Sequence, residues 1–150
     1  PMTYIAGYTG AGLWKTVNGG MSWSNISDGF FKTGTVGAIA VSDFDPNVIY
    51  VGMGEHAVRG VMTSPGDGMY KSEDAGKTWK HIGLPNSYHI ARIQIHPQNS
   101  DVVWVAVQGA VHGPNKERGV YKSTDGGKTW RQVLYVDENT GASELSMDYD

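Results

Sequence analysis

A twelve-residue pattern that occurs three times constrains this chain more than any other feature of its sequence. It reads GVYKSTDGGKTW at residues 119–130, GMYKSEDAGKTW at residues 68–79 and, more loosely, GLWKTVNGGMSW at residues 12–23. Copies at intervals of about fifty residues indicate a repeat architecture, in which each copy belongs to one supersecondary unit that packs against the next. The pattern therefore predicts a repeated structural unit rather than a single active-site signature.

Each copy has the composition of a tight hairpin. A short β-type run precedes the turn, and a second run, opened by the tryptophan, follows it. Between the runs, an aspartate or asparagine can accept hydrogen bonds from loop N–H groups, a glycine can adopt positive φ, and a hydroxyl can bond back into the loop. The residues predicted to build the three turns are Thr16, Asn18, Gly20, Ser22, Trp23, Ser72, Asp74, Gly76, Thr78, Trp79, Ser123, Asp125, Gly127, Thr129 and Trp130.

The pattern Ser/Thr-x-Asp/Asn-x-Gly-x-Thr/Ser-Trp resembles the Asp-box (BNR) motif of sialidases, sortilin-type receptors and xyloglucan-degrading endoglucanases. Nearly the whole chain is also similar to bacterial glycosyl-hydrolase-like proteins with a sortilin N-terminal-like domain. The segments that carry this second resemblance are GDGMYKS (66–72), HIARIQIHP (89–97), GPNKERGVYK (113–122) and LYVDENTG (134–141). The resemblance implies a β-propeller in which each box joins the two outer strands of a blade, away from the binding face.

Composition agrees with an all-β chain and excludes several classes of partner. Twenty-one glycines with eight tyrosines and five tryptophans suit many short strands joined by tight turns. No segment has sustained helical periodicity or is apolar enough to span a membrane, so we expect no membrane partner. The net charge of −3, with lysines placed singly in the boxes, argues against nucleic-acid binding.

The composition also bears on whether the chain binds a metal or a cofactor and on the compartment in which it works. The absence of cysteine excludes disulfides and thiolate metal sites. His56, His89 and His112 could meet at one face, but their spacing matches no metal-ligand pattern, so we expect no metal and no cofactor. The family resemblance implies a secreted or periplasmic protein, whereas the sequence contains no signal peptide, and the compartment therefore stays open.

The expected strand order is that of consecutive four-stranded antiparallel blades, read from the propeller axis outward. The chain reads as three strands without an inner one, two complete blades, and one further inner strand at residues 142–147. We expect one partial propeller domain over residues 1–150, with blades at about 1–27 together with 142–150, 36–83 and 88–135. Each chain thus supplies three blades.

Three blades do not close a ring, because known propellers have about four to eight. We therefore expect a homodimer of two half-propellers that forms a six-bladed ring, in which residues 142–147 of each chain complete the first blade of the other. The alternative is that the sequence is a piece of a longer chain whose remaining blades close the ring. Members of the resembled family are normally several times longer.

Candidate site residues come from the loops expected opposite the boxes, where propellers usually bind ligands. Acidic, histidine and arginine side chains gather there and could bind an anionic or sugar ligand or perform acid–base chemistry. Glu55 and Glu117 are the catalytic candidates. The ligand-binding candidates are His56, Arg59, His89, Arg92, His112 and Arg118. The alternative is that these are solvated loop residues, with His89 and Arg92 held within the inner-strand layer.

Two functions follow from these residues. The first is a non-catalytic binding or scaffold module that offers a central pocket to a glycan or peptide. The second is a xyloglucanase- or sialidase-like glycoside hydrolase with Glu55 or Glu117 as acid/base, which needs two carboxylates about 5–10 Å apart. Residues 8–11 lack the aspartate that xyloglucan-degrading relatives carry before the first box, and the arginines do not occur in sialidase motifs. A third possibility is a structural remnant of a larger enzyme.

Overall fold

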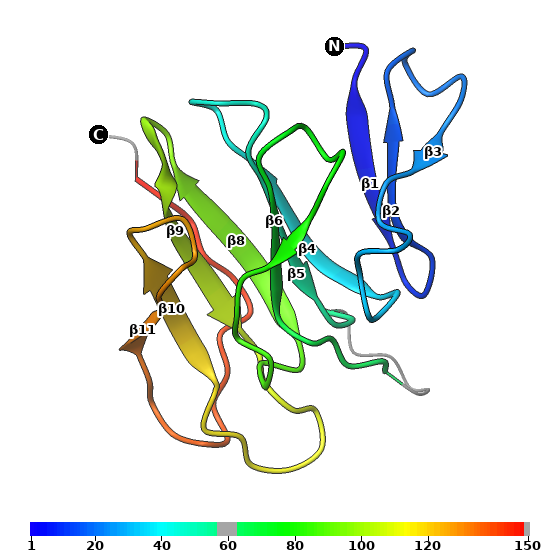
Figure 1. Ribbon diagram of the computed structural model, residues 1–150. Coiled ribbons are helices and arrows are strands. Elements are labelled where there is room, and N and C mark those ends of the chain that lie inside the picture. The colour runs from blue at the N-terminus through cyan, green and yellow to red at the C-terminus, as the bar shows by residue number, and fades with distance from the viewer. Residues whose placement is uncertain (57–62, 149–150) are drawn as a thin grey trace.

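The computed structural model describes residues 1–56 and 63–148, and all regular structure in them is β (Figure 1). The strands form three antiparallel sheets, which confirms the all-β class. The N-terminal sheet contains β1 (Tyr4–Tyr8), β2 (Gly12–Thr16) and β3 (Ser24–Asn25). The middle sheet contains β4 (Val36–Val41), β5 (Ile49–Met53), β6 (Met69–Ser72) and β7 (Lys80–His81). The C-terminal sheet contains β8 (Ile90–His96), β9 (Asn99–Val107), β10 (Gly119–Ser123) and β11 (Arg131–Leu134).

Strands within each sheet follow the order of the chain, so every sheet is a meander. The N-terminal sheet has three strands and lacks the inner strand that β4 and β8 supply to the other two, as the sequence predicts. Each box connects the last two strands of its sheet. The boxes therefore lie at the outer edge of the sheets.

Pairing registers show that the three sheets are copies of one unit. The first hydroxyl residue of each box, Thr16, Ser72 or Ser123, lies opposite Tyr4, Ile49 or Val103 respectively. Because side chains alternate between the two faces of a strand, equal register places equivalent residues on equivalent faces. Tyr4, Ile49 and Val103 are thus the same position in three successive units.

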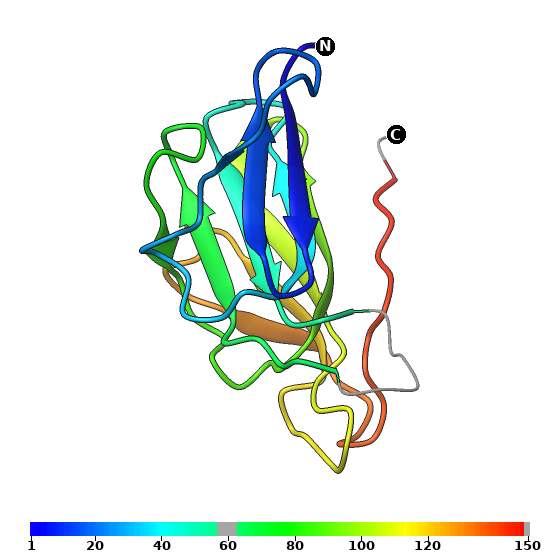
Figure 2. The ribbon, with the colours of Figure 1, turned by 90° about the vertical axis from the view of Figure 1, so that its right-hand side faces the viewer.

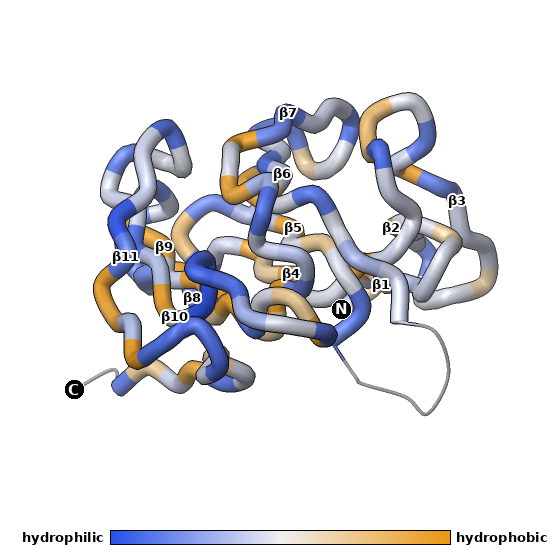
Figure 3. The backbone as a smooth tube through the Cα atoms, turned by 90° about the horizontal axis from the view of Figure 1, so that it is seen from below, coloured by the Kyte–Doolittle hydropathy of each residue, from blue (hydrophilic) through white to orange (hydrophobic). Residues whose placement is uncertain are grey.

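The sheets pack face to face, with apolar residues between them (Figure 3). Between the N-terminal and middle sheets, the core centres on Leu13, Met53 and Trp79. Between the middle and C-terminal sheets it centres on Tyr50 and Val105. Most of these side chains are fully buried, so the stack has two continuous hydrophobic layers.

Two of the box tryptophans join neighbouring sheets to each other. Trp79 Nε1 donates a hydrogen bond of 2.7 Å to the Ile26 carbonyl of the N-terminal sheet. Trp130 Nε1 donates a bond of 2.7 Å to the Ile82 carbonyl of the middle sheet. A bond from the N-terminal sheet to the middle sheet runs the other way: Lys15 Nζ donates to the Ala75 carbonyl of the second box at 2.7 Å. The second and third boxes are therefore each fastened to the sheet before them, a contact that a single copy of the motif does not reveal.

Residues 142–148 differ from the prediction of a strand over residues 142–147. The segment runs along the sheet stack and forms no strand (Figure 2). It lies over the outer face of the C-terminal sheet, where Arg92 Nε is 3.1 Å from Glu144 Oε1 and Gln94 Nε2 donates to the Leu145 carbonyl at 2.9 Å. A strand forms only where its backbone can hydrogen-bond to a neighbouring strand. The predicted neighbour was β1, but the unpaired edge of β1 lies on the far side of the stack (Figure 1).

Candidate functional site

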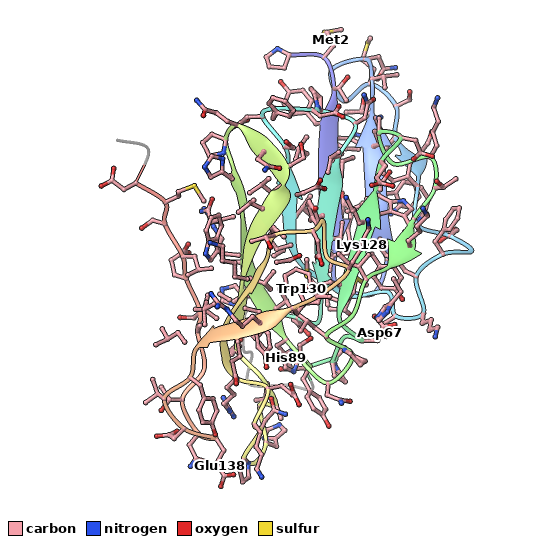
Figure 4. All side chains as sticks on the ribbon, turned by 60° about the vertical axis from the view of Figure 1, so that its left-hand side comes forward. Met2, Asp67, His89, Lys128, Trp130 and Glu138 are labelled. Atoms are coloured by element: carbon pink, nitrogen blue, oxygen red, sulfur yellow. The ribbon has the colours of Figure 1, made fainter. Side chains whose placement is uncertain are left out.

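Box loops and long loops lie at opposite ends of the sheets (Figures 1 and 4). Met2, whose carbonyl accepts from the first box at Gly19 N, is at one end, and His89 and Glu138 are toward the other. We call the second end the long-loop face; its described residues are 54–56, 63–68, 83–89, 108–118 and 137–141. The turn at 137–141 joins it through a bond of 2.8 Å from Asn115 N to the Glu138 carbonyl.

The boxes themselves are closed hydrogen-bond systems. In the second box, Asp74 accepts from Ser72 Oγ at 2.8 Å, from Thr78 N at 2.9 Å and from Thr78 Oγ1 at 2.6 Å. The third box repeats these bonds around Asp125 with the same lengths. Asn18 accepts from Ser22 N at 3.0 Å in the first box. These side chains are occupied within their own turns, which gives them a structural role.

Both box aspartates are stronger acids than usual. Hydrogen bonds from the threonine hydroxyl and backbone lower the pKa of Asp74 from 3.8 to about 2. The Thr129 hydroxyl and N–H likewise lower the pKa of Asp125 to about 2. The ionised carboxylate is therefore the form that the folded turn prefers.

A pH-dependent stability follows from these two carboxylates. Because their folded pKa lies below the unfolded value, the stability that they contribute is present above about pH 4 and is lost as the pH falls toward about 2. We expect the double variant D74N/D125N to have a shallower fall in Tm over this interval than the parent chain. Asn18 shows that the turn accepts an amide. Thermal unfolding from pH 6 to pH 2 measures the difference, and parallel Tm curves would contradict it.

Glu55 and His89 are both buried at the long-loop face. Glu55 is 5% exposed, and its carboxylate accepts from Ser64 N at 3.3 Å. His89 is 2% exposed, and burial lowers its pKa, partly opposed by Glu55 and reinforced by the charge of His112. The structure thus brings Glu55, His89 and His112 near one another, with His89 favouring the neutral imidazole. His56 is half-buried, and Arg59 lies outside the described residues.

The other three candidates contact the chain itself. The Arg118 guanidinium donates to the carbonyls of Gln108 at 2.7 Å and Ala110 at 2.5 Å, so it holds the 108–118 loop. Glu117 accepts from the Tyr121 hydroxyl at 3.0 Å. Arg92 is on the outer face of the C-terminal sheet, paired with Glu144 as described above. The long-loop face therefore does not present these side chains as one set.

A repeated tyrosine–carboxylate pair escaped the sequence analysis. The Tyr70 hydroxyl donates to Asp67 Oδ2 at 2.7 Å, and burial with this bond raises the pKa of Tyr70 to about 12. Tyr121 and Glu117 form the same pair one unit later, and the pKa of Tyr121 is raised for the same reasons. Aligning the copies would have found it, because a carboxylate precedes each box tyrosine by three or four residues.

Six buried polar atoms at the long-loop face have no hydrogen-bond partner among the described residues. They are His56 Nδ1, Ser87 Oγ, His89 Nδ1, Gln108 Oε1, Asn115 Oδ1 and Arg118 Nε. Neither Ser87 nor Gln108 was a sequence candidate, since single polar loop residues carry no recognisable pattern. Buried polar atoms normally find a partner, so these atoms are available to a water or a ligand.

In residues 1–56 and 63–148, no group of three or more histidine, aspartate or glutamate side chains could hold a metal ion. Over the same residues, the chain forms no helix long and apolar enough to cross a membrane.

Comparison with known proteins identifies the family to which this chain belongs. The model of the family described as "Sortilin, neurotensin receptor 3" matches residues 11–143. The chain belongs to the Sortilin-Vps10 family. Among curated proteins, a xyloglucanase of Hypocrea jecorina is 25% identical over 81% of this chain and 15% of its own length. A vacuolar protein sorting/targeting protein 10 of Kluyveromyces lactis is 29% identical over 77% of this chain and 6% of its own length.

Solved structures with the same fold are propeller proteins. An ancestral GH74 enzyme has a TM-score of 0.65 and 23% identity, over 91% of this chain and 17% of that chain. YCF48 bound to D1 peptide has a TM-score of 0.59 and 15% identity, over 90% of this chain and 38% of that chain. The Sortilin-Vps10 chain described here is therefore part of a β-propeller-like fold, and it spans a small fraction of the relatives that it matches.

Proposed function

We propose that this chain is a non-catalytic binding module whose long-loop face holds a glycan or a peptide. The observation that favours it most is that the carboxylates of both catalytic candidates, Glu55 and Glu117, already accept hydrogen bonds from other groups of the chain. Glu117 accepts from Tyr121 as Asp67 accepts from Tyr70, a repeated pairing that positions loops, and Glu55 is buried against Ser64. A glycosidase instead needs one carboxyl group to protonate the leaving oxygen and a second facing it across the sugar.

The unpartnered atoms of the long-loop face support binding rather than a purely structural role. Ser87 Oγ and His89 Nδ1 belong to the 83–89 loop and Gln108 Oε1 to the 108–118 loop, and the two loops meet where Gln108 N donates to the His89 carbonyl at 2.9 Å. The two ligand classes follow from the relatives: one similar fold is an enzyme of the GH74 group, a matched protein is a xyloglucanase, and the YCF48 structure contains a peptide. A face that holds either ligand needs hydrogen-bonding groups of this kind.

Calorimetric titration with xyloglucan oligosaccharides and with D1 peptide tests the proposal, alongside a reducing-sugar assay. We expect one of the probes to bind without release of reducing ends. H112A, at an exposed residue of the 108–118 loop, should weaken binding about fivefold, the equivalent of one hydrogen bond of about 1 kcal/mol. K77A, at the box end, should leave binding unchanged.

Two results would overturn the proposal. Hydrolysis that is lost in E55Q or E117Q would show the alternative, a glycoside hydrolase. Failure of both probes to bind, with the chain folded, would leave the long-loop face without either proposed ligand class.

A further inference from the structure

The 83–89 loop makes a tight turn at Tyr88. The His89 N–H donates to the Ser87 carbonyl at 2.6 Å, and Tyr88 between them has a φ of 57°. A turn of this hand over so few residues is rare and strained, because a side chain at positive φ crowds the following carbonyl. Glycine adopts such a conformation without that strain. The loop therefore keeps a tyrosine at a position where the backbone favours glycine.

The β5–β6 loop holds the Tyr88 turn in place. The Tyr88 carbonyl accepts from Gly66 N at 2.6 Å. Gly54 leaves room for the same carbonyl, since a Cβ at Gly54 would overlap its oxygen. Strained residues persist only where the surrounding structure fixes them, and they cluster at binding sites and switch regions. The strain at Tyr88 is thus maintained by contacts from a second loop of the long-loop face.

The Tyr88 ring is exposed, and its two neighbours carry buried polar atoms. Tyr88 is 41% exposed, whereas Ser87 and His89 on either side of it are 1% and 2% exposed. Ser87 Oγ and His89 Nδ1 have no hydrogen-bond partner among the described residues, and neither has Gln108 Oε1, whose loop meets this one at His89. One loop therefore carries both an accessible aromatic ring and buried polar atoms that are free to bind a ligand.

These unpartnered atoms accept hydrogen bonds more than they donate them. Burial lowers the pKa of His89, and a hydrogen bond to the Glu55 backbone opposes this shift. A backbone group that raises the pKa of a histidine is a carbonyl, so the bonded ring nitrogen carries the proton and Nδ1 of the neutral ring is an acceptor. Gln108 Oε1 is also an acceptor, and Ser87 Oγ can accept or donate. Uncharged hydroxyl groups match these atoms, whereas a carboxylate, which only accepts, does not.

We propose that Tyr88 is a platform on which one sugar ring of a glycan stacks, with hydroxyl groups of the glycan donating to His89 Nδ1 and Gln108 Oε1. This inference rests on the proposed function and selects the glycan over the peptide as the ligand of the long-loop face. The C–H groups of a sugar ring are weakly positive and pack on the negative face of an aromatic ring. A side chain that is fixed in advance loses little conformational freedom on binding, which gives the strained turn a purpose.

A stability measurement separates this role from a structural one without any ligand. Y88G should raise Tm by about 2 °C, because glycine adopts the positive φ freely. Ala75 is the matched control: it has a φ of 60° in the second box, at the position where the other boxes carry Gly19 and Gly126. A75G should raise Tm by a similar amount. A Tm that falls in Y88G alone would show that the side chain packs to hold the loop, and would overturn the proposal.

Calorimetric titration with xyloglucan oligosaccharides tests the stacking itself. Y88A and Y88G should weaken binding about tenfold, while Y88F, which keeps the aromatic ring, should stay within about twofold of the parent chain. A75G should bind as the parent chain does, because its substitution is in a box at the other end of the sheets. Y88G is thus expected to be more stable and to bind less well, a combination that a merely structural tyrosine would not give.

The outcomes distinguish this inference from the proposed function. Binding of D1 peptide without binding of the oligosaccharides would overturn the sugar platform and leave the binding module standing. Oligosaccharide binding that Y88A does not weaken would do the same. Failure of both probes to bind would overturn the platform and the proposed function together.

Discussion

Replacing Trp79 by alanine is expected to lower the free energy of unfolding by about 3–5 kcal/mol, the range for truncation of a buried aromatic residue. The indole is 6% exposed and contacts the Phe31 ring edge-on at 5.3 Å between centroids. Its Nε1 also makes the 2.7 Å bond to Ile26 that joins the N-terminal and middle sheets. Urea unfolding of the parent and variant chains measures the loss.

Trp79→Phe separates the two contributions of this side chain. Phenylalanine keeps much of the aromatic volume but leaves the Ile26 carbonyl without its donor, which should cost about 1–3 kcal/mol. W23F is the matched change in the first box, where the indole Nε1 makes no hydrogen bond to the described residues and Trp23 is 40% exposed. If W79A lowered the free energy of unfolding by less than about 1 kcal/mol, the contacts of Trp79 would not be what holds the N-terminal and middle sheets together.

Gly37→Ala is expected to cost about 3 kcal/mol, at the upper end for overpacking. A Cβ at this position would lie 2.2 Å from the Gly54 carbonyl oxygen and 2.3 Å from the Ile90 carbonyl oxygen. Both obstacles are backbone, so no side chain can rotate away. The inner strands β4 and β8 would have to separate, and urea unfolding should show it as a lower midpoint.

Ala91 provides the matched control for this prediction. It occupies the position of Gly37 one sheet later, at the same irregularity in strand pairing. Ala91→Gly should cost only about 0.5–1 kcal/mol, mainly from the greater freedom of glycine in the unfolded chain. A similar small cost for G37A would show that the inner strands are not held in close contact.

Part of the candidate site was accessible from sequence. The boxes could be predicted because their bonds close within a few residues: Asp74 reaches Ser72 and Thr78 in one turn. The placement of Glu55 and His89 near one face followed from the order of strands and loops. The partners of Arg118 and Glu117 did not, since a carbonyl acceptor or a tyrosine hydroxyl leaves no distinctive spacing.

The sequence alone determined the repeat, the all-β class, the missing inner strand of the first sheet and the turn chemistry of each box. These follow from local hydrogen bonding and from the periodicity of short strands. Tertiary structure decided what joins one unit to the next. Trp130 bonds to Ile82, 48 residues away, and residues 142–148 lie on the C-terminal sheet without a ladder of their own. Such contacts depend on how sheets pack face to face, and no local pattern encodes that geometry.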